Sequence, residues 1–77
     1  MTTTVIQNVL REIELLGFKN PYFMEKLDGS QIIKMEANYI PKDRMLKLID
    51  FCNDYDLEFE IVNESKNAIG VEIWQRL

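Results

Sequence analysis

Apolar residues recur at helical spacing near the start of the chain. From Val5 to Leu16 they fall on one side of a helix, while charged residues occupy the other. Thr3 or Thr4 is a suitable N-cap, and Gly17 follows the last apolar position as helix C-caps commonly do. The pattern therefore predicts an amphipathic helix with one buried face.

A second helix is predicted in the middle of the chain. Pro41 suits its first turn, and Asp43 lies where a negative charge favours a helix amino end. The polar segment 53–56 ends the helix. The residues expected on its buried side are Met45, Leu46, Leu48, Ile49, Phe51 and Cys52.

The remaining segments alternate apolar and polar residues, which is typical of strands that are buried on one side. Asp28-Gly29-Ser30 lies between the first two segments, and Asp-Gly is a strong hairpin signal. A second turn is expected at residues 64–67. The predicted strands are Tyr22–Leu27, Gln31–Ala37, Leu57–Asn63 and Ala68–Gln75.

The order of these elements is αββαββ, and the two halves have related patterns. An offset of thirty-six residues places Leu10 on Leu46, Phe23 on Phe59 and other apolar positions on one another. The match indicates either a pseudo-repeat of an αββ unit or convergence on one pattern. Pairing of the halves predicts an α+β two-layer sandwich, with a four-stranded, mainly antiparallel sheet and both helices on one face. The order is also a circular permutation of the ferredoxin-like βαββαβ layout.

Strand alternation predicts which side chains the helices leave uncovered. Phe23, Ile33, Ile61 and Ile73 are expected to face the helices. The opposite face would then carry Trp74, Ile32, Val62 and Tyr22 among charged residues, and we expect these four to contact a partner. Two alternatives remain. The four residues are ordinary scattered surface residues, or the first strand is shifted by one position, which would place Tyr22 and Met24 in the core.

Composition limits the chain to one small domain, residues 1–77. Its longest apolar run is three residues, which is too short for a membrane span. The amino-terminal residues lack the basic and apolar regions of a signal peptide. A single cysteine excludes an internal disulfide and suits the reducing cytoplasm, where we expect the protein to act.

The chain is acidic, with a net charge of −4. Such a balance argues against general binding of nucleic acid and favours a partner with a basic surface. The acidic strip Asp54, Asp56, Glu58 and Glu60 is interpreted either as a solvated surface or as part of that contact.

Residues that carry chemistry are scarce. The chain has no histidine, and Cys52 lies on the predicted buried side of the second helix, where a thiol is inert. A calcium loop starting at Asp54 fails because Phe59 occupies the position that requires glycine. We therefore expect no catalytic residues, no cofactor and no metal site.

These observations predict a non-catalytic protein–protein interaction module, a small adaptor or inhibitor that binds through the open sheet face and the acidic strip. A homodimer is also expected, because a second copy would enlarge the small core. The alternative is a nucleic-acid-binding regulator that uses a basic patch of Lys42, Arg44 and Lys47 at the start of the second helix.

Overall fold

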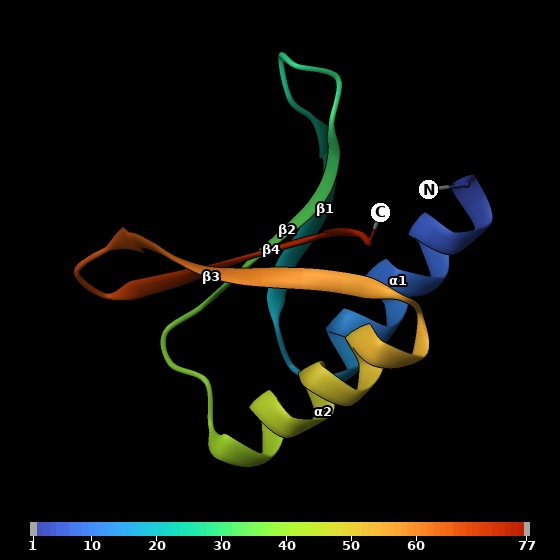
Figure 1. The fold of residues 1–77 in the computed structure, drawn as a ribbon. Coiled ribbons are helices and arrows are strands. Elements are labelled where there is room, and N and C mark those ends of the chain that lie inside the picture. The colour runs from blue at the N-terminus through green and yellow to red at the C-terminus, as the bar shows by residue number, and fades with distance from the viewer. Residues whose placement is uncertain (1, 77) are drawn as a thin grey trace.

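The computed structural model describes residues 2–76 and confirms the predicted α+β architecture. Two helices pack on one face of a four-stranded sheet, and the two hairpins project away from them in different directions (Figure 1). Met1 and Leu77, the ends of the expected domain, lie outside the described residues. The elements are α1 (Thr3–Leu15), β1 (Lys19–Glu25), β2 (Gln31–Ala37), α2 (Lys42–Asp54), β3 (Leu57–Ser65) and β4 (Ala68–Gln75).

The N-cap of helix α1 lies one residue before the nearer of the two predicted caps, Thr3. Thr2 is the N-cap, and its hydroxyl oxygen accepts a hydrogen bond from the Val5 amide at 3.3 Å. The prediction of the carboxyl end is confirmed: Gly17 follows the helix with a φ of 95°. A side chain at this position would also approach the guanidinium of Arg44 to 3.0 Å. Glycine is therefore required there by both backbone and space.

Helix α2 begins directly after Pro41, which the sequence placed inside the first turn. Pro41 is the N-cap, because its ψ of 153° is extended, and its carbonyl accepts from the Met45 amide at 2.9 Å. Asp43 lies in the first turn as predicted. Beyond the helix, Asp56 takes a φ of 56° and redirects the chain into β3.

The sheet has the strand order β1-β2-β4-β3, and every neighbouring pair is antiparallel. The inner strands join the two αββ halves, with Ile33 opposite Ile73 and Met35 opposite Val71. At the offset of thirty-six residues Met35 corresponds to Val71, and these two residues lie opposite each other in the ladder. A two-fold axis that relates the two halves places them in this way. The outer strands depart from this relation. Phe23 pairs with Ile33, whereas Phe59 pairs with Ile73, which makes the second hairpin longer.

Strand β1 starts and ends earlier than predicted. It includes Lys19, and its register shifts between Lys19 and Tyr22, where Asn20 has a φ of 53° and Pro21 provides no amide. Leu27 belongs to the turn, because the hairpin is already closed at Lys26, whose backbone amide donates a hydrogen bond to the Ser30 carbonyl at 2.8 Å. Strand β3 continues two residues beyond the predicted Asn63.

The phase of the strands is the predicted one. Met24 pairs with Ile32 and Phe23 with Ile33, so the alternative register of the first strand is wrong. Helix α1 packs on β1, and α2 packs on β3. The core lies between the two layers and includes Val9, Ile13, Phe18, Ile33, Met35, Ala37, Leu48, Phe51, Cys52, Leu57, Val71 and Ile73.

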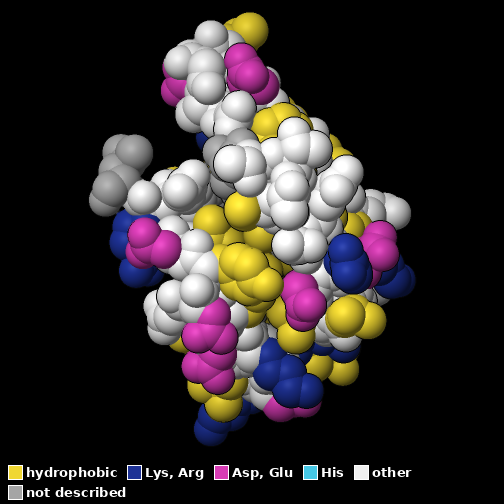
Figure 2. All heavy atoms as spheres, turned by 90° about the vertical axis from the view of Figure 1, so that its right-hand side faces the viewer, with side chains coloured by type: hydrophobic (Ala, Val, Ile, Leu, Met, Phe, Trp, Pro, Cys, Tyr) yellow, Lys and Arg dark blue, Asp and Glu magenta, His cyan; other side chains and the backbone are white. Residues whose placement is uncertain are grey.

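Three apolar residues expected in this interior are exposed instead: Leu46, Ile49 and Ile61. The buried side of α2 is centred on Leu48 and Cys52, which leaves the other two α2 residues at its margin. No strand lies beyond β3 in the described sheet, so nothing covers this margin. On the side seen in Figure 2, hydrophobic side chains remain visible between charged ones. Neither helix within residues 2–76 has the length and apolarity needed to cross a membrane.

Because the helices do not cover the edge of the sheet, we predict different losses of unfolding free energy when two isoleucines on the same sheet face are replaced by alanine. Ile73→Ala should destabilise the protein by about 2–5 kcal/mol, because it leaves a cavity in the core. Ile61→Ala, at an exposed position, should cost less than about 1 kcal/mol. Urea unfolding followed by circular dichroism measures both. Equal losses would contradict this boundary of the core.

Candidate functional site

The face of the sheet opposite the helices is not covered by any other described element (Figure 1). Cross-strand pairs such as Met24 with Ile32, Lys34 with Glu72 and Glu58 with Trp74 share this face. They carry the mixture of apolar and charged side chains that alternation predicts. The face is therefore where the fold leaves room for a partner.

A hollow of about 540 Å³ lies on this open face. It brings together three of the predicted contact residues: Ile32, Trp74 and Glu60. Ile32 is only 3% exposed although it stands outside the core between sheet and helices. It therefore forms part of the lining of the hollow and is not the accessible contact that the sequence suggested. The remaining lining residues are Lys26, Gly29, Ser30, Gln31, Glu72 and Gln75.

The other predicted contact residues lie outside the hollow. Tyr22 is exposed on the outer strand β1, and Val62 is partly buried near the far end of β3. Both share the open face through their strand phase, since Tyr22 pairs with Lys34 and Val62 with Gly70. They can contact only a partner that extends beyond the hollow.

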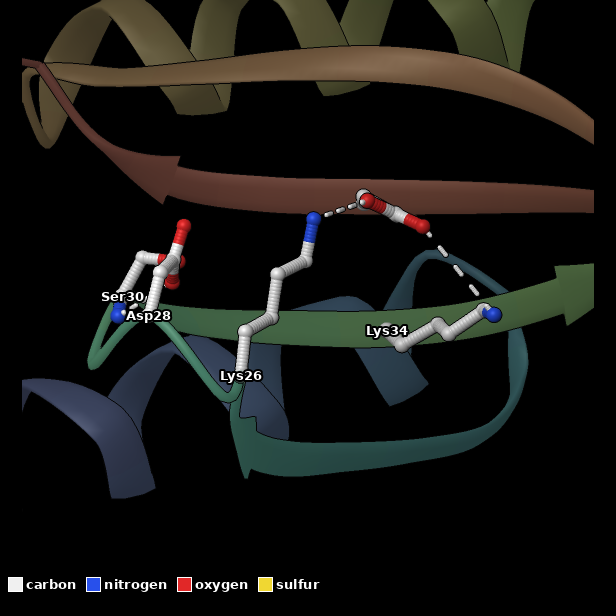
Figure 3. A network of polar contacts seen from close by, with 5 residues as sticks. Lys26, Asp28, Ser30 and Lys34 are labelled. Atoms are coloured by element: carbon white, nitrogen blue, oxygen red, sulfur yellow. Dashed lines mark hydrogen bonds and ion pairs between the residues drawn. The ribbon is translucent and has the colours of Figure 1, made fainter.

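Glu72 is the centre of the charges beside the hollow. Lys26 Nζ lies 3.3 Å from its carboxylate and Lys34 Nζ lies 4.0 Å from it. Figure 3 shows that the Lys26 side chain passes across β2 to reach β4. Ile32 lies on β2 on the same face, opposite Met24 of β1, and lines the hollow together with Lys26. On the other side, Glu60 stands opposite Glu72 in the ladder, and this pair of like charges favours a nearby cation.

The turn that positions Lys26 is fixed by its own hydrogen bonds. Asp28 accepts from the Ser30 amide at 2.9 Å and from the Ser30 hydroxyl, and Gly29 takes a φ of 87° (Figure 3). These bonds hold the pKa of the Asp28 carboxyl below its usual value. Their contribution to stability is present above the ordinary pKa and is lost as the pH falls through the lowered one.

The acidic strip is divided by the structure. Glu58 and Glu60 lie on the open face, Asp56 lies in the turn before β3, and Asp54 ends α2. Arg76 holds two of these acids, at 3.4 Å from Asp56 and 3.6 Å from Glu58. No side-chain hydrogen bond or ion pair of Asp54 or Glu60 is found within the part of the chain that the structure describes.

Arg76 was missed by the sequence analysis. It follows β4, and the antiparallel pairing of β4 with β3 brings it to the turn that begins β3. Its backbone amide donates to the Asp56 carbonyl at 3.0 Å, and its guanidinium donates to the Leu57 carbonyl at 3.2 Å. The sequence does show a basic residue just after the last predicted strand, but the residues that it contacts depend on the register of the sheet.

Packing engages part of the basic patch that was predicted, in the alternative interpretation, to bind nucleic acid. The guanidinium carbon of Arg44 lies 5.8 Å from the centre of the Phe18 ring, a cation–π contact between α2 and the segment that joins α1 to β1. Arg44 and Lys47 also line a hollow of about 150 Å³ together with the carboxylate residue Asp43. Lys42 remains exposed. Arg44 thus has a structural role at this end of the molecule.

The groups that carry chemistry are few. Cys52 is buried in the core, and burial raises the pKa of its thiol to about 11, with Arg76 opposing part of the rise. No cluster of three or more His, Cys, Asp or Glu side chains suited to hold a metal ion is found among residues 2–76.

The raised pKa of Cys52 predicts slow thiol chemistry in the folded protein. The shift from 9.0 to about 11 lowers the thiolate fraction by about a hundredfold at neutral pH. Reaction with Ellman's reagent should be slower in the native protein than in urea by at least that factor. Stability should fall as the pH rises from 9.0 to about 11, because the unfolded thiol ionises first. Cys52→Ala should lose this part of the pH dependence, and rapid native labelling would contradict the burial.

Comparison with protein-family models, curated proteins and solved structures finds no match to this chain. Its function is therefore inferred from the uncovered sheet face, the hollow and the surrounding charges.

Proposed function

We propose that the protein is a non-catalytic protein-binding module, a small adaptor or inhibitor that acts in the cytoplasm through the open face of its sheet. One observation carries the proposal: the hollow on that face, which Ile32 and Trp74 line on one side and two carboxylates line on another. Apolar concavities with a few placed polar groups are typical binding sites.

The lining indicates the chemistry of the partner. An apolar side chain that enters the hollow meets chiefly the Trp74 ring, because Ile32 lies in the lining and is nearly fully buried. Full burial of such a side chain contributes about 1.5–3 kcal/mol. A neighbouring lysine or arginine of the partner would reach Glu60 and compete with Lys26 for Glu72. Because these charges are partly exposed, the basic residue sets orientation and association rate more than affinity.

A partner other than a second copy is favoured by the charges of this face. Lys26 and Lys34 are outnumbered there by Glu36, Glu58, Glu60 and Glu72. Two copies that met through this face would bring the same acidic residues together, which costs free energy. The homodimer expected from the small size of the chain is therefore the competing outcome of the test.

The test is affinity capture with matched variants. Tagged wild type, Trp74→Lys and Tyr39→Lys are incubated with nuclease-treated lysate of the source organism. Tyr39 is the control because it is an exposed aromatic residue that follows β2, at the opposite end of that strand from Ile32. We expect a protein that wild type and Tyr39→Lys retain and Trp74→Lys loses. The purified protein should then shift Trp74 emission to shorter wavelength on titration, because binding removes water from the ring.

Other results would overturn the proposal. A captured protein retained equally by Trp74→Lys would place the contact elsewhere. Recovery of the chain alone, with a sedimentation dimer that Trp74→Lys dissociates, would make the open face a homodimer interface. Retention that disappears with nuclease treatment and depends steeply on salt would support the nucleic-acid-binding alternative.

A further inference from the structure

The two outer strands of the sheet differ in how open their edges are. Strand β1 is interrupted by Pro21 and by the shift of register between Lys19 and Tyr22, features that commonly protect a sheet edge. Strand β3 contains neither proline nor glycine and pairs without interruption from Leu57 to Asn63. An additional strand would therefore find a regular template only at β3.

The register shows which backbone groups of β3 point away from the sheet. The Arg76 amide donates to the Asp56 carbonyl, so that carbonyl points toward β4, while the Asp56 amide donates to the Asn53 carbonyl. Every second residue of an antiparallel strand directs its amide and carbonyl to the same side, so the backbone groups of Glu58 and Glu60 also point toward β4. The amides and carbonyls of Phe59 and Ile61 consequently face outward. Arg76 already occupies the carbonyl of Leu57 at 3.2 Å, so the open segment begins after that residue.

The side chains along this edge have different chemistry on the two sides of the sheet. On the helical side Ile61 is 41% exposed, and Ile49 and Leu46, one turn apart on α2, are 37% and 53% exposed. On the open side lie the carboxylate of Glu58, which Arg76 approaches to 3.6 Å, and that of Glu60, for which the described residues provide no side-chain partner. The edge thus has an apolar border on one side and an acidic border on the other.

From this arrangement we infer that β3 accepts an additional strand from a protein partner, an extended segment in which basic and apolar residues alternate. Its backbone would pair with Phe59 and Ile61. Its basic side chains would face Glu58 and Glu60, and its apolar ones would cover Ile61, Ile49 and Leu46. The inference goes beyond the proposed function, because it uses the backbone edge of β3, and Glu60 is the residue that this edge shares with the lining of the hollow.

A second copy of the chain fits this edge less well. If two β3 strands paired antiparallel about Phe59, Glu58 of each copy would stand opposite Glu60 of the other. Cross-strand pairs of like charge are destabilising. The same carboxylates that discourage self-association favour a basic segment, so charge complementarity selects the occupant.

A synthetic nine-residue peptide of alternating lysine and valine, labelled with fluorescein, tests the inference by fluorescence anisotropy. One control peptide has the same composition with all lysines in one block and all valines in another. A second control is N-methylated at the amides that would face β3. We expect each control to bind at least about tenfold more weakly, which corresponds to about 1.4 kcal/mol. Amide exchange of Phe59 and Ile61 should slow when the alternating peptide binds.

Variants of the protein locate the contact. Glu60→Lys should weaken binding at least about tenfold, while Glu36→Lys, the same change on the inner strand β2, should weaken it less than about threefold. Ile61→Pro removes an outward amide without breaking the ladder with β4 and should abolish binding; circular dichroism verifies its fold. Trp74→Ala should leave binding within about threefold, which separates this edge from the hollow.

The inference is overturned if the block peptide binds as well as the alternating one, or if both charge reversals have equal effects, since either result indicates unspecific charge attraction. Unchanged exchange at Phe59 and Ile61 would also overturn it. A dimer in sedimentation that Ile61→Pro dissociates would identify a second copy as the occupant of the edge. Loss of peptide binding has no bearing on whether Trp74 is needed for capture, so the two proposals fail separately.

Discussion

The antiparallel pairing of β2 with β4 is the contact on which the rest of the molecule depends. Each αββ half has a hairpin and a helix, and such a unit cannot bury its apolar face alone. Pairing the inner strands places Ile33 beside Ile73 and Met35 beside Val71, all fully buried beneath the helices. The same pairing brings Lys34 to Glu72, while the pairing of β4 with β3 brings Arg76 to the start of β3. The core and part of the surface charge pattern therefore follow from the register of the inner strands.

The described elements leave one face of the sheet uncovered. Two helices of thirteen residues each cover the other face, and no further element is found within residues 2–76. A small domain meets this problem partly with its own side chains. Lys26 extends across β2 to Glu72 on the face where Ile32 lies, and Ile32 is nearly as buried as the core. The contact is polar and partly exposed, and a competing cation can displace it.

Local patterns were sufficient to predict most of the fold. Alternation identified the strands and their faces, and the structure confirms that phase even for β1, where Pro21 and the bulge displaced the boundaries. The errors have a common origin. Helical periodicity defines an apolar arc but not where the opposing layer ends, which is why Leu46 and Ile49 emerged as exposed. The hollow and the contacts of Arg76 depend on strand order and register, and no local pattern contains them.

Glu60 links the two surfaces that the fold leaves open. Its carboxylate lines the hollow, and its backbone belongs to the outer strand β3. A segment paired along β3 would therefore place a side chain opposite Glu60 at the margin of the hollow. The edge specifies direction and spacing through backbone groups, while the hollow selects one side chain. A partner that used both would gain specificity from their fixed separation, because the same strand holds the edge and one wall of the hollow.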